Sequence, residues 1–244
     1  MTETLIYPTP AAASRALCDT LARISDSAMA VRDRFTIALS GGSTPRMAFD
    51  LLAGEYGQEV DWPGTYVFWA DERCVPPESP ESNARLAREH LLNYVRTPLD
   101  HQYRILGELP PGEAAQRYDD QLRKFFTSRN MRSARFDLLL LGMGEDGHVA
   151  SLFPGSPALQ ERERWAVAVQ RPNEPFGRVS LTLPAINSAA HIIVLVTGAE
   201  KAGIVARVVR GDRSASTLPA HLLAPSNGKL TWILDEAAAH DLQA

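Results

Sequence analysis

Short apolar runs alternate with amphipathic segments along the whole chain. Runs of about five apolar residues predict buried strands, and apolar residues at helical spacing predict helices. We expect strands over residues 35–39, 65–70, 136–141, 165–169, 179–183, 191–196 and 230–234. We expect helices over residues 11–31, 46–53, 83–95, 113–128, 185–188, 199–209 and 236–242. This alternation predicts an α/β fold with a mainly parallel sheet between two layers of helices.

The composition is that of an ordinary globular protein, with 45% hydrophobic and 22% charged residues. No stretch rich in proline, glycine or serine divides the chain, so we expect one domain over residues 1–244. The net charge of −4 gives no basic footprint for nucleic acid or an anionic membrane. No apolar run approaches the length of a membrane span, and no signal peptide is recognisable.

Two cysteines, Cys18 and Cys74, fit a reducing cytoplasm and provide no disulfide framework. Cys74 follows Arg73 and is a candidate for an activated thiol. No histidine adjoins it in the sequence, so we expect a structural role. No cysteine and histidine cluster has zinc spacing, and we expect no metal site.

The stretch over residues 136–155 carries the strongest candidate for chemistry. Its apolar run ends in Gly142 and Gly144 and is followed at once by Asp146, Gly147 and His148. Ligands of open α/β sheets bind at the carboxyl ends of the strands. An imidazole delivered there is a candidate general base, because it titrates near neutral pH. The alternative is a surface loop with an idle histidine.

The same glycines also match the dinucleotide-binding pattern G-x-G-x-x-G. That pattern requires a long helix after the third glycine and an acidic residue at the end of the next strand. Pro154 interrupts any helix here, and the run over residues 165–170 ends in no acid. The sequence therefore favours the general base over a nucleotide site.

A second candidate is the glycine-rich turn after the run over residues 35–39. Gly41, Gly42, Ser43 and Thr44 come before Pro45, which is suited to the first position of a helix that Thr44 would cap. Free N–H groups and the helix dipole favour an anion at such a helix start, and the hydroxyls add donors. We expect a phosphate site, although the Walker A ending is missing. The alternative is an ordinary, well-capped turn.

Charged residues occupy three further positions near predicted strand ends. Asp71, Glu72 and Arg73 follow the run over residues 65–70, where a solvated turn is the alternative. Arg178 opens the run over residues 179–183. Lys201 lies in a first helical turn, where its charge opposes the helix dipole. That placement is explained if Lys201 reaches an anion, and otherwise it is an exposed lysine.

Three segments together resemble the 6-phosphogluconolactonases: SGGSTP at residues 40–45, DERCVPPESPESN at 71–83 and GMGEDGHVASLFPG at 142–155. LTLPAIN at 181–187 and VTGAEKA at 196–202 fit as well. More distantly, the chain is similar to the glucosamine-6-phosphate deaminases. Those enzymes continue the histidine loop into Phe-Asn-Glu-Pro and typically place an aromatic residue at the position of Arg73. This chain has neither feature, which favours the lactonase.

The resemblance implies a Rossmann-like, three-layer fold without a metal or other cofactor. It implies hydrolysis of 6-phospho-D-glucono-1,5-lactone to 6-phosphogluconate, the second step of the pentose phosphate pathway. We therefore expect a small phosphorylated sugar lactone as the ligand of a cytoplasmic enzyme that is a monomer or a weak homodimer. The alternatives are a deaminase-like sugar-phosphate isomerase and a non-catalytic sugar-phosphate sensor. A sensor could lose His148, so the intact Asp146-Gly147-His148 segment disfavours it.

Under this hypothesis His148 takes a proton from the attacking water. Asp146 orients the imidazole or favours its charged form, and Arg73 stabilises the oxyanion or shapes the sugar pocket. The residues expected to bind substrate are Gly41, Gly42, Ser43, Thr44, Asp71, Arg178 and Lys201. Among them, Gly42, Ser43 and Thr44 would hold the phosphate, with Arg178 and Lys201 neutralising its charge.

Overall fold

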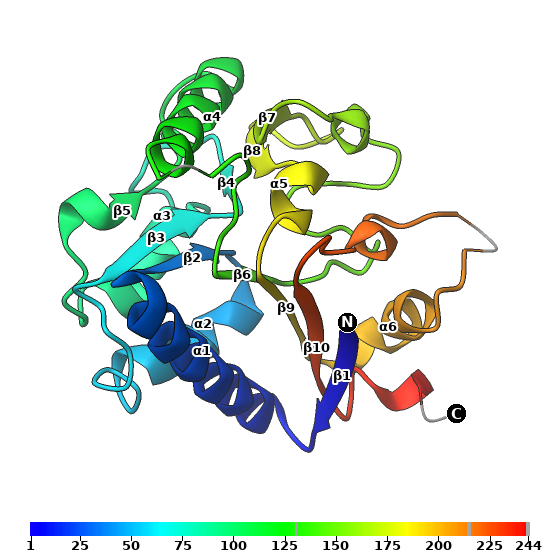
Figure 1. Ribbon diagram of the computed structural model, residues 1–244. Helices are drawn as coiled ribbons and strands as arrows, with labels where there is room; N and C mark the ends of the chain where they lie inside the picture. Colours follow the sequence, from blue (N-terminus) through cyan, green and yellow to red (C-terminus); the bar gives the residue numbers. More distant parts are fainter. Residues whose placement is uncertain (130, 214–215, 243–244) are drawn as a thin grey trace.

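A parallel sheet of seven strands forms the centre of the fold (Figure 1). The structure, a computed structural model, describes residues 1–129, 131–213 and 216–242. In order across the sheet the strands are β1 (Thr2–Tyr7), β10 (Lys229–Asp235), β9 (His191–Val196), β6 (Leu138–Leu141), β2 (Phe35–Leu39), β3 (Thr65–Trp69) and β5 (Gln102–Tyr103). Every residue of β2 and β6 is buried, as expected for strands covered on both faces.

Helices pack around the strands and add buried apolar side chains to the core. They are α1 (Pro10–Arg32), α2 (Ser43–Ala53), α3 (Asn83–Ala87), α4 (Pro111–Thr127), α5 (Leu183–Asn187) and α6 (Ala202–Val209). Figure 1 shows α1 and α2 side by side against the sheet, and α4 apart from them at the top of the view. The rings of Phe125 and Phe126 of α4 lie 5.0 and 6.0 Å from that of Phe68 in β3. The α/β, Rossmann-like fold with a mainly parallel sheet is confirmed.

A second, antiparallel sheet stands at the carboxyl edge of the first and was not predicted. Its strands are β4 (Asp71–Arg73), β8 (Arg178–Leu181) and β7 (Ala166–Val169), in that order. Ala70 joins the two sheets: its N–H donates to the Leu39 carbonyl and its own carbonyl accepts from Leu181, both at 2.7 Å. The chain therefore passes from β3 into β4 without a loop, which places Asp71 and Arg73 above the parallel strands.

Most predicted elements are present with shifted ends, but one helix is wrong and three strands were missed: β1, β4 and β5. Residues 236–242 form turns and a short 3-10 helix, His240–Leu242. Asp235 accepts from the N–H groups of both Ala238 and Gly198, so it caps a turn that is tied to the neighbouring loop. The missed strand β1 lies at the sheet edge with one neighbour, and its partly exposed residues give no continuous apolar run.

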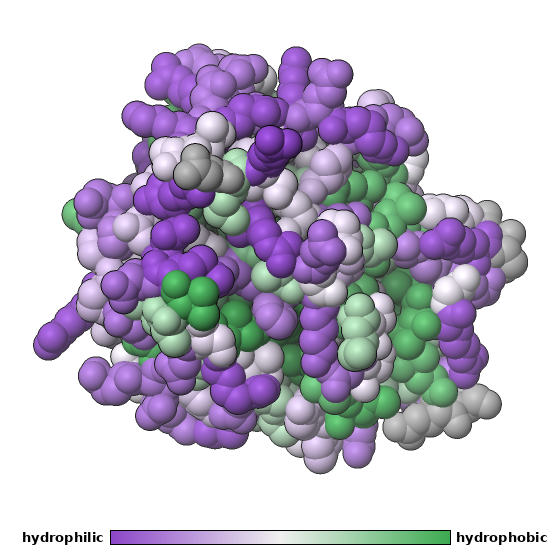
Figure 2. Space-filling model, in the orientation of Figure 1, coloured by the Kyte–Doolittle hydropathy of each residue, from purple (hydrophilic) through white to green (hydrophobic). Residues whose placement is uncertain are grey.

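One cluster of buried apolar side chains runs from Ala13 to Ala239 and includes Val179 and Leu181 of the second sheet. Figure 2 shows a mostly hydrophilic face with smaller hydrophobic areas, in keeping with apolar residues gathered inside. The single domain expected over residues 1–244 stays a prediction that this shared core favours. Among the described residues, no helix combines the length and the apolar character needed to cross a membrane.

Candidate active site

A cavity of about 470 Å³ opens at the carboxyl edge of the parallel sheet. Its walls come from the segments that follow β2, β6 and β9, together with β4 and the start of β8. Nine of the ten predicted site residues line it: Gly41, Gly42, Ser43, Thr44, Asp71, Arg73, His148, Arg178 and Lys201. The remaining residue, Asp146, touches His148 from outside the lining. The cavity thus brings residues from distant parts of the chain into one place.

The imidazole of His148 is held by the carboxylate of Asp146. His148 Nδ1 lies 2.5 Å from Asp146 Oδ1, and the backbone N–H of His148 donates to the same oxygen at 3.1 Å. A carboxylate can only accept, so Nδ1 carries a proton, and in the neutral imidazole Nε2 has the lone pair. Nε2 is therefore the nitrogen able to accept a proton.

Asp146 remains ionised down to strongly acidic pH. Partial burial raises its pKa, but hydrogen bonds from His148 and the charges of His148 and Arg171 outweigh burial and lower the pKa of Asp146 to about 2. Arg171 NH2 stands 3.7 Å from Asp146 Oδ2, on the side away from His148. The orienting carboxylate therefore keeps its charge throughout the physiological range.

Gly144 makes room for the His148 ring. A Cβ atom at residue 144 would lie 2.1 Å from His148 Nδ1 and 2.8 Å from Asp146 Oδ1. On another side, the ring of Phe153 lies 4.7 Å from the imidazole, centroid to centroid. The glycine pattern thus serves close packing of the histidine, and no long helix follows it.

The turn after β2 presents the start of α2 to the cavity. Gly42 has φ 114°, a conformation that favours glycine, and it occupies the N-cap position without a side-chain hydrogen bond. The expected cap by Thr44 is wrong, because α2 begins two residues earlier than expected, at Ser43 instead of Pro45. Thr44 Oγ1 lies 3.3 Å from Thr197 Oγ1 instead, which joins the turn to the segment after β9. The first turn is therefore uncapped by any side chain and remains suited to an anion.

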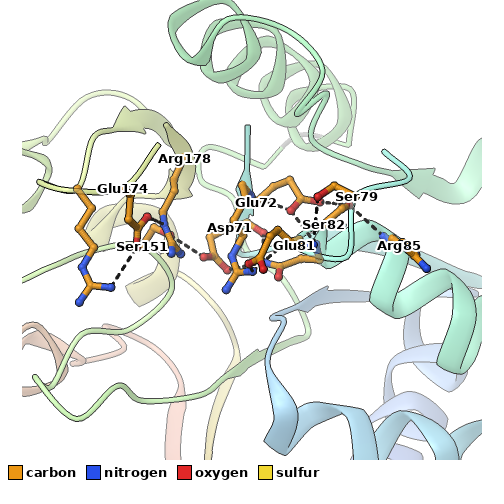
Figure 3. A network of polar contacts seen from close by, with 12 residues as sticks. Asp71, Glu72, Ser79, Glu81, Ser82, Arg85, Ser151, Glu174 and Arg178 are labelled. Atoms are coloured by element: carbon orange, nitrogen blue, oxygen red, sulfur yellow. Dashed lines mark hydrogen bonds and ion pairs between the residues drawn. The ribbon is translucent and has the colours of Figure 1, made fainter. Parts of the chain in front are cut away.

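Asp71 is buried at the base of a polar network (Figure 3). Ser151 Oγ donates to Asp71 Oδ2 at 2.6 Å, and Asn83 Nδ2 lies 3.2 Å from Asp71 Oδ1. Neighbouring Arg73 donates from NH1 to the Glu81 carbonyl at 2.8 Å. The alternative of a solvated turn is excluded for this segment, since Asp71 is 5% exposed and lines the cavity.

Glu72, unlike its neighbours Asp71 and Arg73, does not line the cavity and instead joins two elements of the fold. It is 2% exposed, and its oxygens accept from Ser82 Oγ and from three backbone N–H groups, those of Arg73, Asn83 and Ala84. Burial raises its pKa, and the backbone hydrogen bonds oppose that rise. Glu72 thus ties β4 to the start of α3 and fixes Asn83, which lines the cavity.

The charges of the cavity lining are mixed. The lining contains the cations Arg73, Arg178 and Lys201 and the carboxylates Asp71, Glu145 and Glu200. Lys201 Nζ stands 3.6 Å from Glu145 Oε1, and Arg178 is paired with Glu174 outside the lining. A phosphate would therefore replace or join existing carboxylate partners.

Sequence reasoning missed several residues of this site. Asn83, Thr197 and Glu145 line the cavity, and each falls inside a motif segment, which was the available signal. Ser151 lies behind the lining and also falls inside a motif segment, but its bond to Asp71 joins residues 80 positions apart. Glu174 lies outside the motif segments and gave no signal, although its partner Arg178 is only four residues away.

Other reactive groups do not add a second chemistry. Burial, followed by the charge of Glu72, raises the pKa of Cys74 to about 11, which is the opposite of an activated thiol. Within the described ranges, no group of three or more His, Cys, Asp and Glu residues is arranged to hold a metal ion.

Comparisons with known proteins place the chain among sugar-phosphate enzymes. Residues 8–232 match the family model described as "Glucosamine-6-phosphate isomerases/6-phosphogluconolactonase". The chain is 40% identical over 236 residues to "Probable 6-phosphogluconolactonase 1" of Arabidopsis thaliana, covering 93% of this chain and 88% of that protein. It is 38% identical over 218 residues to the "6-phosphogluconolactonase" of Nostoc sp., covering 89% and 88%.

A solved structure agrees with these sequence relatives. The fold is similar to the 6-phosphogluconolactonase from Trypanosoma cruzi, with a TM-score of 0.86 and 30% identity over 100% of this chain and 98% of that one. The fold, the sequence similarity and the motif residues that line the cavity all indicate the same family. The chain belongs to the family of glucosamine-6-phosphate isomerases and 6-phosphogluconolactonases.

Proposed function

We propose that this protein hydrolyses 6-phospho-D-glucono-1,5-lactone to 6-phospho-D-gluconate. One observation carries the proposal: the imidazole of His148, held by Asp146, shares a cavity with the uncapped start of α2 and with Lys201. The imidazole can assist the attack of water on a lactone carbonyl. The helix start and Lys201 can bind a phosphate. A cavity of about 470 Å³ has the size of a small-molecule site.

In the proposed complex the phosphate lies at the turn over residues 41–44. Backbone N–H groups and the hydroxyls of Ser43 and Thr44 donate to its oxygens, while Arg178 and Lys201 supply positive charge. Holding the phosphate at one end fixes the lactone carbonyl at the other, which removes much of the entropic cost of the reaction. Asp71 binds the sugar part of the substrate between them.

In the proposed reaction His148 Nε2 takes a proton from water as the water oxygen bonds to C1 of the lactone. Arg73 stabilises the oxyanion that forms on the carbonyl oxygen. The intermediate collapses with cleavage of the bond between C1 and the ring oxygen, which receives the proton from the imidazolium. The product is the open-chain acid, which ionises at neutral pH. Asp146 keeps the imidazole in the required tautomer and stabilises its charged form.

We further propose that residues 1–244 act as one domain, supported by the core that both sheets share. A cytoplasmic location agrees with the two cysteines, Cys18 and Cys74, which are free. Some plant relatives are named chloroplastic, so location varies among the relatives. The expectation of a monomer or weak homodimer stays a prediction.

The test is the rate of lactone hydrolysis at near-neutral pH, measured above the spontaneous rate. We expect the wild-type protein to accelerate the reaction and His148→Ala to lose the acceleration by about 10²–10⁴-fold while still binding substrate. Ammonia release from glucosamine 6-phosphate would identify a deaminase instead. Phosphate-ligand binding without either reaction would identify a sensor.

A further inference from the structure

Glu174 lies in the loop between β7 and β8, outside the cavity lining, and joins two arginines. Its carboxylate accepts from Arg178 Nε at 2.7 Å and from Arg178 NH2 at 2.9 Å. The same carboxylate accepts from Arg171 NH1 at 3.0 Å. Its side chain is 17% exposed, so these contacts are shielded from much of the solvent. Glu174 is thus the shared anion of two cations.

The first arginine, Arg178, faces the cavity and is fixed on two sides (Figure 3). Besides its pair of bonds to Glu174, it reaches Ser151 Oγ at 3.3 Å through NH1. A guanidinium has five N–H donors, and these contacts use three of them. Two N–H groups have no acceptor among the residues that the structure describes. Because Arg178 lines the cavity, we expect these N–H groups to be available to a ligand there.

The second arginine, Arg171, approaches the catalytic pair. Its NH2 stands 3.7 Å from Asp146 Oδ2, beyond hydrogen-bond distance, while its guanidinium carbon lies 4.8 Å from the centre of the Phe153 ring. Asp146 binds His148 through the other oxygen, Oδ1. A continuous line of charged contacts therefore runs from Arg178 through Glu174 and Arg171 to Asp146.

We infer that Glu174 is a positioning residue for both ends of the site. Without its charge, the two arginines would repel one another and turn towards the remaining carboxylates. Arg171 would close its 3.7 Å gap to Asp146 and compete with His148 for that carboxylate. Arg178 would lose the two bonds that set the plane of its guanidinium. This inference rests on the proposed hydrolysis. It adds a residue that holds Arg178 in place for substrate binding and keeps Arg171 from disturbing the contact between Asp146 and His148.

The test is Glu174→Gln, which keeps the shape of the side chain and removes its charge. Both constants for lactone hydrolysis are measured: kcat is expected to fall about 10-fold, because Asp146 is drawn from His148, and KM to rise about 10-fold, because Arg178 is no longer fixed. The double variant Glu174→Gln with Arg171→Gln removes the competing arginine. It is expected to recover much of kcat while KM stays high.

Glu108→Gln is the matched control. Glu108 and Arg104 also form a two-bond pair four residues apart, at 2.8 and 2.6 Å, away from the cavity lining. We expect its kcat and KM to stay within twofold of wild type.

Several results would overturn the inference. Unchanged constants in Glu174→Gln would do so, and so would a double variant with no recovery of kcat, since a merely structural loop contact predicts no such recovery. If Glu174→Gln does not fold, Glu174→Asp replaces it. This variant keeps the charge but moves the carboxylate away from the arginines, so a smaller fall in kcat and a smaller rise in KM are expected. A wild-type protein without hydrolysis above background would instead contradict the proposed function itself.

Discussion

Asp146 accepts two hydrogen bonds from His148 on a single oxygen, Oδ1, one from the ring and one from the backbone. The two residues are separated only by Gly147, which has φ 75° and lets the chain turn back on itself. The ring orientation is therefore set locally, by three consecutive residues. This relationship makes the tautomer of His148 a property of the loop.

The first prediction concerns that tautomer. In Asp146→Asn the amide can donate to Nδ1, which favours the form with the proton on Nε2, and that form cannot accept a proton from water. We expect kcat for lactone hydrolysis to fall about 10²–10⁴-fold, with a much smaller change in KM. Asp241→Asn is the control, because Asp241 contacts His240 Nδ1 at 2.9 Å on the surface. A kcat within threefold of wild type in Asp146→Asn would remove Asp146 from the mechanism.

The second prediction concerns the space beside the ring. In Gly144→Ala the new methyl group would overlap His148 Nδ1, at 2.1 Å, so the imidazole must move. A misplacement of about 1 Å costs about 10²-fold in rate, and we expect kcat to fall by that order. At Gly112 a Cβ atom meets nothing within 4 Å, so Gly112→Ala should leave kcat unchanged. The test is the kcat of the two variants in steady-state kinetics. Equal kcat values would contradict the inference that Gly144 makes room for the His148 ring.

The third prediction concerns the phosphate. Lys201 lines the cavity with its side chain 18% exposed and contacts Glu145 at 3.6 Å. A charged hydrogen bond is worth about 1.5–3 kcal/mol, so Lys201→Ala should raise KM about 10- to 100-fold with kcat less affected. Lys229→Ala, which removes a surface pair with Glu3, is the control. An unchanged KM in Lys201→Ala would count against a phosphate role.

The fourth prediction concerns stability. In Glu72→Gln one oxygen becomes an NH₂ group, and at either position it faces at least one backbone N–H that has lost its acceptor: those of Arg73 and Asn83, or that of Ala84. We expect the free energy of unfolding in urea to fall by about 1–3 kcal/mol. The exposed Glu78, paired with Arg88, gives the control: Glu78→Gln should change stability by less than about 0.5 kcal/mol. Equal unfolding midpoints for the two variants would show that the hydrogen bonds accepted by Glu72 do not stabilise the fold.

The central strands and most helices could be predicted because their patterns are local. Leu138–Leu141 is wholly apolar, and Pro10–Arg32 carries its apolar residues at helical spacing. The edge strand Thr2–Tyr7 could not be found this way, because its half-exposed residues depend on β10 for pairing. The turn after Asp235 was taken for a helix because its bond to Gly198, 37 residues away, is invisible in the sequence.

The α/β class and most of the candidate site follow from the sequence alone. Glycines, hydroxyl groups and charged residues that follow a strand can be recognised in the sequence. Because parallel strands have their carboxyl ends at one edge of the sheet, such residues are expected to lie close together. Which charged side chains line the cavity, and which lie behind its lining, could be read only from the folded chain. Glu72 and Asp71 are adjacent in sequence but have different contacts. Glu174 pairs with arginines close to it in sequence, and its role follows from what they reach in another segment: Asp146 from Arg171 and Ser151 from Arg178. The physical reason is that burial and charge pairing depend on neighbours contributed by other segments, which no local pattern records.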